Sequence, residues 1–195
     1  TYVLGVYAEL LTRSCYSLLD GASQPAELVQ AASQLGVRHL GLCDRDGVYG
    51  LVQAHKAAID HGVHLVCGAQ LTVSLGADQP AAGLVLLVVD RTGWAEAKGR
   101  SRVPLSAVAE RAEGLLCVLR PGWSANLAGP LRDAYHGRLA VALSRDLTPA
   151  DRPRVAAALG LARGLGCPAV ATNDPKMHDR SRQVVADVLT CIRRK

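Results

Sequence analysis

Three carboxylates and three cationic side chains follow short apolar stretches of the sequence, where they are available for chemistry. The carboxylates are Asp20, Asp44 and Asp174, and the cationic side chains are Arg13, Arg45 and Lys176. If the carboxylates converge at one site, they form a group of like charges, which is costly when it is buried. If the cations converge with them, the outcome is an ion-pair cluster instead, because each cation favours the charged form of a neighbouring carboxylate.

The elements that must position these groups are seven apolar, strand-sized stretches that alternate with helical patterns. The predicted strands cover residues 6–11, 37–43, 64–73, 84–90, 115–119, 138–143 and 168–172. Several are apolar at nearly every position, which is typical of strands covered on both faces, and strands joined through helices pair in parallel. We therefore predict an α/β fold, a distorted seven-stranded barrel, forming a single domain over residues 1–195.

Local signals mark the helix ends. Ser23 is the expected N-cap of a helix that has Pro25 in its first turn and stops at Gly36. Further helices are expected at residues 51–61, 105–113, 148–165 and 181–193, whereas the polar segment 91–104 is predicted to be a loop.

In parallel barrels, functional groups gather at the C-terminal ends of the strands. Those positions hold Leu11, Thr12, Arg13, Asp20, Asp44, Arg45, Asp46, Gln70, Asn173, Asp174 and Lys176, with His178 just beyond.

The residues around these positions are similar to a known family. The stretches are YAELLTRSCYSLLDGASQPAELVQAASQLGVRHLGLCDRDGVYG, VCGAQL and VATNDPKMHDRSRQVVADVLTCIRRK. They resemble the N-terminal PHP (polymerase and histidinol phosphatase) domain of bacterial C-family DNA polymerases, the replicative DNA polymerase III alpha subunit and its error-prone paralogue. The last stretch is closest to the error-prone branch.

The resemblance implies a distorted seven-stranded barrel of PHP type whose active members bind up to three zinc or manganese ions and hydrolyse phosphoesters. Where the family has His-x-His after the first strand, this chain has Leu11 and Arg13, and Asp20 matches the next ligand. The family's Asp-His after the second strand is Asp44 and Arg45, and its Glu is Gln70. The final Asp-x-His corresponds to Asp174 and Lys176.

All of these replacements remove groups that could bind a metal ion. Imidazole and carboxylate ligands give way to an alkyl group, an amide and groups that stay cationic at pH 7. We expect no catalytic residue and no bound metal here, with Asp20, Asp44 and Asp174 as the ligands if any ion is held. The hypothesis is that Arg13, Arg45 and Lys176 neutralise the three aspartates.

Charge is distributed unevenly along the chain. Residues 1–90 carry 4 basic and 8 acidic side chains, and residues 91–195 carry 18 and 9. This asymmetry favours an anionic partner for the second half, although a solvated arginine-rich surface explains it equally well. The predicted contacts with nucleic acid or a partner are Lys98, Arg100, Arg102, Arg193, Arg194 and Lys195.

Cysteine usage and hydropathy indicate the compartment. The six cysteines lack CxxC spacing and are expected to be reduced, and no secretory signal or membrane-spanning stretch is visible. We therefore expect a cytoplasmic chain without membrane contact. Because it begins at Thr1 and its only methionine is Met177, either an initiator was removed or the chain is a piece of a longer protein.

The function expected is a PHP-like domain with a degenerate metal site, a structural or interaction module in DNA synthesis, replication and repair. Its partner would be a polymerase body in cis or in trans, and DNA is a further possible partner. Polymerase chemistry is not expected within the chain. The rival interpretation is a metal-dependent phosphoesterase, an exonuclease or phosphatase using zinc or manganese, with a site rebuilt from Asp20, Asp44, Asp46, Asp174 and His178. A third is a free nucleic-acid-binding module, with salt-sensitive affinity.

Overall fold

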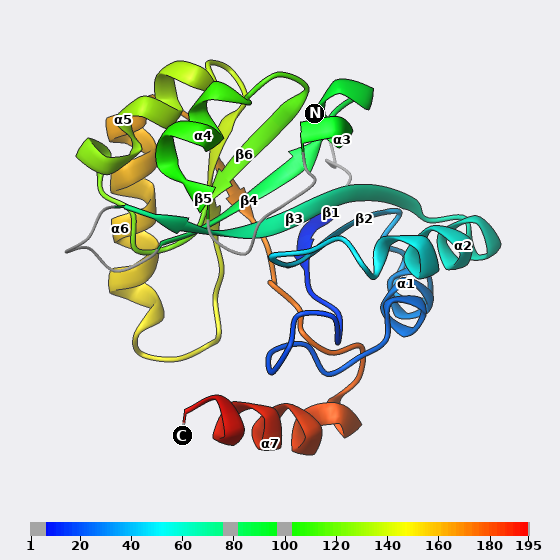
Figure 1. Ribbon diagram of the computed structural model, residues 1–195. Coiled ribbons are helices and arrows are strands. Elements are labelled where there is room, and N and C mark those ends of the chain that lie inside the picture. Colours follow the sequence, from blue (N-terminus) through cyan, green and yellow to red (C-terminus); the bar gives the residue numbers. More distant parts are fainter. Residues whose placement is uncertain (1–6, 76–81, 97–102, 195) are drawn as a thin grey trace, which may run out of the picture. The chain divides into compact units, whose positions relative to one another are not determined.

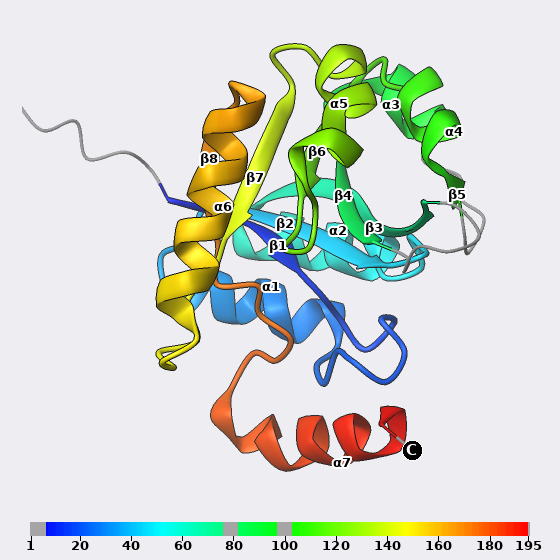
Figure 2. The same ribbon diagram turned by 90° about the vertical axis from the view of Figure 1, so that its left-hand side faces the viewer.

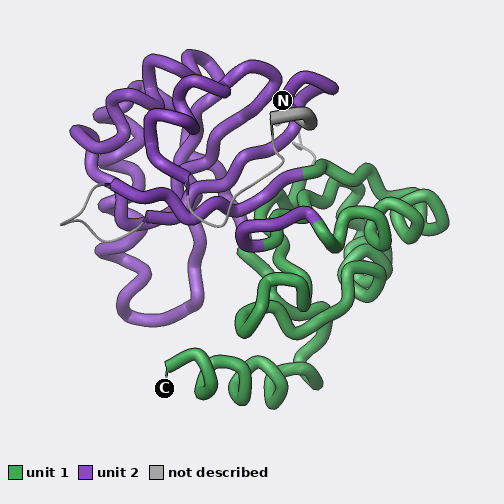
Figure 3. The backbone as a smooth tube through the Cα atoms, in the orientation of Figure 1, with its two compact units in different colours: residues 1–44, 49–67, 174–195 green, residues 45–48, 68–173 purple. Residues whose placement is uncertain are grey.

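The computed structural model describes residues 7–75, 82–96 and 103–194 (Figure 1). Its residues form two compact units, each assembled from separate chain segments (Figure 3). Unit 1 comprises residues 1–44, 49–67 and 174–195, and unit 2 comprises residues 45–48 and 68–173. The single domain predicted over residues 1–195 stays a prediction. No helix in the described part of the chain is long and apolar enough to cross a membrane.

Unit 1 contains the parallel pair β1 (Ala8–Thr12) and β2 (His39–Arg45), of which Arg45 belongs to unit 2. Gly41 of β2 is required by this pairing, because a Cβ there would lie 2.4 Å from the carbonyl oxygen of Leu10. Helices α1 (Pro25–Gln34) and α2 (Leu51–His61) lie side by side (Figures 1 and 2). The unit ends in a short 3-10 helix, η1 (Arg180–Arg182), and α7 (Gln183–Arg193).

Two helix ends in unit 1 follow their local sequence closely. Helix α2 ends where predicted, because Gly62 adopts the left-handed conformation with φ +65°. The cap of α1 differs from the prediction by one residue. Gln24 is the N-cap and its backbone N–H donates to the Glu27 carboxylate at 2.8 Å, while Ser23 hydrogen-bonds elsewhere.

Unit 2 is a mixed sheet with helices packed against it. β3 (His64–Ser74) begins in unit 1 and continues here, followed along the sheet by β4 (Ala82–Val88), β6 (Leu115–Leu119), β7 (Leu139–Leu143) and β8 (Ala169–Ala171). The two-residue β5 (Val103–Pro104) pairs with β3. The helices are α3 (Arg91–Glu96), α4 (Leu105–Glu110), α5 (Ala125–Ala134) and α6 (Asp151–Leu165), the last of which packs against β7 (Figure 2).

The expectation that all strands pair in parallel is wrong for β4, which runs antiparallel to both β3 and β6. Only seven residues, 75–81, separate β3 from β4 in the sequence. A parallel connection needs a dozen or more residues, so the chain reverses direction instead. The pairs β6–β7 and β7–β8 are parallel, as predicted.

Two helices of unit 2 were not predicted. The segment expected to be a loop begins with α3, whose first turn is capped by the Asp90 carboxylate accepting from the backbone N–H groups of Thr92 and Gly93. Residues 97–102 lie outside the described part. Helix α5 contains Pro130, which weakens its helical pattern, and it forms because Ala128 and Leu131 are buried in the core.

The core of unit 2 is built from aliphatic side chains of its strands and helices, with few aromatics. Tyr135 is fully buried and its hydroxyl donates to the Val108 carbonyl at 3.0 Å. The indole N–H of Trp123 donates to the Gly83 carbonyl at 2.9 Å. All six cysteines are free; Cys43 and Cys117 are buried, while Cys191 is exposed.

A candidate site centred on Asp20

The loop that follows β1 is tied to the segment that follows β8. The backbone N–H of Arg13 donates to the Pro175 carbonyl at 3.0 Å, and that of Ala22 donates to the Lys176 carbonyl at 2.7 Å. Within the loop, Gly21 approaches Ser14 so closely that a Cβ would lie 1.8 Å from its carbonyl oxygen. These contacts bring Arg13, Asp20, Asp174 and Lys176 together within unit 1, although 161 residues separate Arg13 from Asp174.

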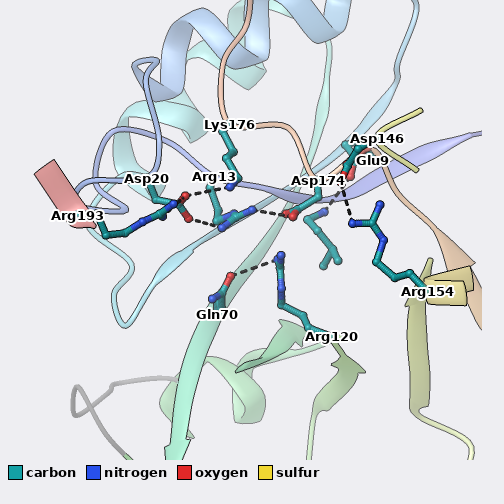
Figure 4. Close-up of polar contacts among 11 residues, drawn as sticks. Glu9, Arg13, Asp20, Gln70, Arg120, Asp146, Arg154, Asp174, Lys176 and Arg193 are labelled. Atoms are coloured by element: carbon teal, nitrogen blue, oxygen red, sulfur yellow. Dashed lines mark hydrogen bonds and ion pairs between the residues drawn. The ribbon is translucent and has the colours of Figure 1, made fainter. Parts of the chain in front are cut away.

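Arg13 links two of the predicted carboxylates (Figure 4). One nitrogen of its guanidinium, Nη1, donates to Oδ2 of Asp20, and Nη2 donates to Oδ2 of Asp174 at 2.7 Å. The Arg13 side chain is buried, and a buried charge is tolerable only when it is paired and hydrogen-bonded. Asp174 is held with φ +49°, a conformation that few residues other than glycine adopt.

Asp20 is the centre of the cluster. Besides Arg13, it contacts Lys176 Nζ at 3.0 Å and Arg193 Nη1 at 2.7 Å, both through Oδ1 (Figure 4). Its own side chain is only 1% exposed. Burial by itself raises the pKa of this carboxyl, but the charge of Arg13 and the hydrogen bonds from Lys176 and Arg193 outweigh burial and lower the pKa to about 2. Asp20 is therefore ionised at neutral pH.

Asp44 is held by hydroxyl and amide groups. Its carboxylate accepts from the Ser14 backbone N–H, the Ser14 hydroxyl and the Ser17 hydroxyl, each at 2.7 Å. Gly50 makes room for it, because a Cβ at that position would lie 2.8 Å from Oδ2. The hypothesis that cations neutralise Asp44 does not account for Ser14 and Ser17, which lie in the loop directly after β1.

Four of the other predicted positions are placed as follows. Leu11 is buried in unit 1, whereas Arg45 and Gln70 belong to unit 2. Gln70 Oε1 accepts from Arg120 Nη1 at 3.3 Å, a contact that the sequence did not indicate. Asp46, also in unit 2, accepts from the backbone N–H and the hydroxyl of Thr72 at 2.8 and 2.9 Å, so its carboxylate fixes the backbone.

His178 lies in unit 1 beside the start of α1. Its Nδ1 lies 2.8 Å from the Ser23 hydroxyl and 3.6 Å from the Glu27 carboxylate, which also pairs with Arg182. The N–H of Gln24, then the side chain of Arg182, lower the pKa of Glu27. His178 thus links the start of α1 to the segment that leads to α7.

Some of the basic residues predicted to contact nucleic acid or a partner lie within the described residues, and others do not. Arg193 lies in the Asp20 cluster, a contact that no local sequence signal indicates, because 173 residues separate Arg193 from Asp20. Arg194 is exposed at the end of α7. Lys98, Arg100, Arg102 and Lys195 lie outside the described residues.

The residues present do not fit a metal ion. Two of the three predicted carboxylates already contact guanidinium or ammonium groups, which repel a cation and cannot ligate it. Asp44 has three hydrogen-bond donors on its two oxygens. Across the ranges that the structure describes, no group of three or more His, Cys, Asp or Glu side chains is arranged to hold a metal.

Solved structures of other proteins show which type of fold this chain has. An amidohydrolase from Chromobacterium violaceum with bound sulfate and no metal matches 87% of each chain with a TM-score of 0.67 at 15% identity. A two-domain protein from Bacteroides vulgatus containing a predicted PHP-like metal-dependent phosphoesterase matches 90% of this chain and 53% of its own, with a TM-score of 0.64 at 13% identity. These likenesses confirm the predicted α/β fold of PHP type.

A family model for the PHP domain matches residues 9–147, and the chain belongs to this family. Among curated proteins, the error-prone DNA polymerase of Anaeromyxobacter dehalogenans is 41% identical over 96% of this chain, and that of Alkalilimnicola ehrlichii is 38% identical over 97%. Error-prone DNA polymerase 1 of Agrobacterium fabrum is 33% identical over 96%. The chain spans only 18–19% of the length of these relatives.

Proposed function

We propose that this PHP domain is a structural module of an error-prone DNA polymerase and that it performs no metal-dependent phosphoester hydrolysis. The proposal rests on the ion pairs of two carboxylates. Asp20 pairs with Arg13, Lys176 and Arg193, and Asp174 pairs with Arg13. A metal ion would have to displace these cations, and a bound ion and the cations would repel each other. The proposal therefore includes neither zinc nor manganese as a cofactor.

Helix α7 supports a partner in cis, the remainder of the polymerase. Val184, Val188 and Ile192 recur every fourth residue, so they share one side of the helix, and each is more than half exposed. The helix is fixed at both ends by ion pairs, Arg182 with Glu27 before it and Arg193 with Asp20 at its last turn. A helix anchored through charges, with an exposed apolar side, is suited to pack against a further part of the polypeptide.

Elemental analysis of the purified chain tests the proposal. After equilibration with zinc or manganese and removal of free ions, we expect far less than one bound ion per chain and no hydrolysis of bis-p-nitrophenyl phosphate. The matched variant carries Arg13→His and Lys176→His, which replaces two cations by neutral imidazoles and should raise the affinity for both metals. A stoichiometric ion in the unchanged chain, with hydrolysis abolished by Asp174→Ala, would show that the site is a working phosphoesterase and that the proposal is wrong.

A further inference from the structure

A cavity of about 460 Å³ lies beside the loop that leads from β7 into α6, drawn in yellow in Figure 1. Its lining residues are Arg145, Thr148, Pro149, Asp151, Arg152 and Val155. All of them belong to unit 2, so the cavity does not include the Asp20 cluster of unit 1. The volume is in the range of sites that hold a ligand in proteins.

Two arginines of this cavity are available for a ligand. Arg145 and Arg152 are exposed, and the guanidinium of neither forms an ion pair or a hydrogen bond with any residue that the structure describes. The nearby carboxylates are paired with a third arginine, because Arg154 contacts Asp146 at 2.8 Å and also contacts Asp151 (Figure 4 shows Arg154 and Asp146). A carboxylate that enters the cavity therefore meets two guanidinium groups that no other carboxylate has to release.

The loop beside the cavity is held in one conformation. The Asp151 carboxylate accepts from the backbone N–H groups of Asp146 and Thr148, at 3.1 and 3.2 Å. Leu147, between these two donors, is 87% exposed and has φ +58°, a left-handed conformation that is costly for leucine. Strained residues of this kind persist where surrounding contacts impose them, and they are concentrated at binding sites. A partner would lose little affinity to ordering this loop, because the loop is ordered already.

The surface of the cavity favours a polypeptide as the ligand. Pro149 and Val155 give it apolar walls, and Leu147 adds an exposed apolar side chain in the same loop. A nucleic acid strand is usually held by bases stacked on aromatic side chains, and none of the described residues that line the cavity is aromatic. A second copy of this chain, packed symmetrically, would bring its own two arginines to the same place, where like charges repel. Carboxylates beside an apolar side chain match both the arginines and the walls.

We propose that this cavity is a docking site for an acidic segment of a partner protein. Arg145 and Arg152 bind carboxylates of the segment through charge-assisted hydrogen bonds, and an apolar side chain of the segment packs against Pro149 and Val155. The inference goes beyond the proposed function, because none of these residues belongs to the Asp20 cluster or to α7.

Peptide selection on the purified chain tests the site. A phage library of random peptides is selected on the unchanged chain and depleted on the double variant Arg145→Glu/Arg152→Glu, so that only peptides needing these arginines remain. We expect the remaining peptides to share a pair of acidic residues next to an apolar residue. A synthetic peptide of recovered sequence should bind Arg152→Gln at least about tenfold more weakly than the unchanged chain, as the loss of one charged hydrogen bond predicts. Arg145→Gln gives an independent second measurement.

The matched control is Arg163→Gln, because Arg163 is an exposed arginine of the same helix that does not line the cavity. Arg163→Gln should bind the peptide as the unchanged chain does, and all three single variants should unfold at the same temperature as the unchanged chain. The docking site would be refuted by a selection that leaves no peptide, by recovered peptides without acidic residues, or by an equal loss of binding in Arg163→Gln. Displacement of the peptide by a single-stranded oligonucleotide, or by dimerisation of the chain itself, would also overturn the proposal and would identify the other occupant.

Discussion

Replacing Asp20 by Asn tests the electrostatic account of the cluster most directly. The substitution keeps the size of the side chain and removes the charge that Arg13, Lys176 and Arg193 contact. In the folded chain the pKa of Asp20 is lowered from 3.8 to about 2, because the three cations outweigh the opposing effect of burial. Each pKa unit corresponds to about 1.4 kcal/mol, so ionised Asp20 contributes about 2 kcal/mol to the free energy of unfolding at pH 7.

The pH range of this contribution follows from the sign of the shift. A carboxyl whose pKa is lower in the folded than in the unfolded state stabilises the fold above the unfolded pKa and loses this effect as the pH falls through the folded value. The contribution is therefore complete above about pH 5 and declines between about pH 4 and pH 2. Asp20→Asn should lower the free energy of unfolding by about 2 kcal/mol or more at pH 7, because it also leaves buried Arg13 with fewer carboxylate contacts.

Urea unfolding at a series of pH values measures the effect. The free-energy difference between the unchanged chain and Asp20→Asn should shrink by more than half between pH 5 and about pH 2.5, which separates Asp20 from other carboxyl groups that titrate in both proteins. Asp133→Asn removes an exposed carboxylate that contacts Arg132 and should change stability by no more than about 0.5 kcal/mol. A difference between the unchanged chain and Asp20→Asn that stays constant over this pH range would refute the reasoning.

Two further predictions concern Asp44 and helix α7. Asp44→Ala should lower the free energy of unfolding by at least about 2 kcal/mol, since it leaves three donors of Ser14 and Ser17 without their acceptor; a change below about 0.5 kcal/mol in urea unfolding would contradict this. Val188→Ser should change the stability of the chain by no more than about 0.5 kcal/mol, because the side chain is exposed, whereas Leu28→Ala, which truncates a buried side chain of α1, should cost about 2 kcal/mol or more. A large loss of thermal stability in Val188→Ser would show that the apolar side of α7 is buried within the chain itself.

The alternation of strands and helices, and the position of most elements, can be predicted from the amino-acid sequence. Apolar stretches long enough for strands, and glycines such as Gly62 that end helices through a left-handed residue, act over a few neighbouring positions and are visible in the sequence. It also indicated which positions would follow the strands, and thereby that Arg13, Asp20, Asp174 and Lys176 should be considered together. The resemblance to PHP domains came from the same positions, and the family match confirms it.

Which of these groups make contact depends on the fold and not on the local sequence. The antiparallel direction of β4 and the formation of α5 despite Pro130 depend on connection length and core burial, which outweigh local propensity. Likewise, Asp44 is satisfied by two serines of a nearby loop, and Asp20 gains Arg193 from the far end of the chain. A buried carboxylate is stabilised by whichever donors the folded backbone brings within about 3 Å, and the number of residues between donor and acceptor does not reveal which donors these are.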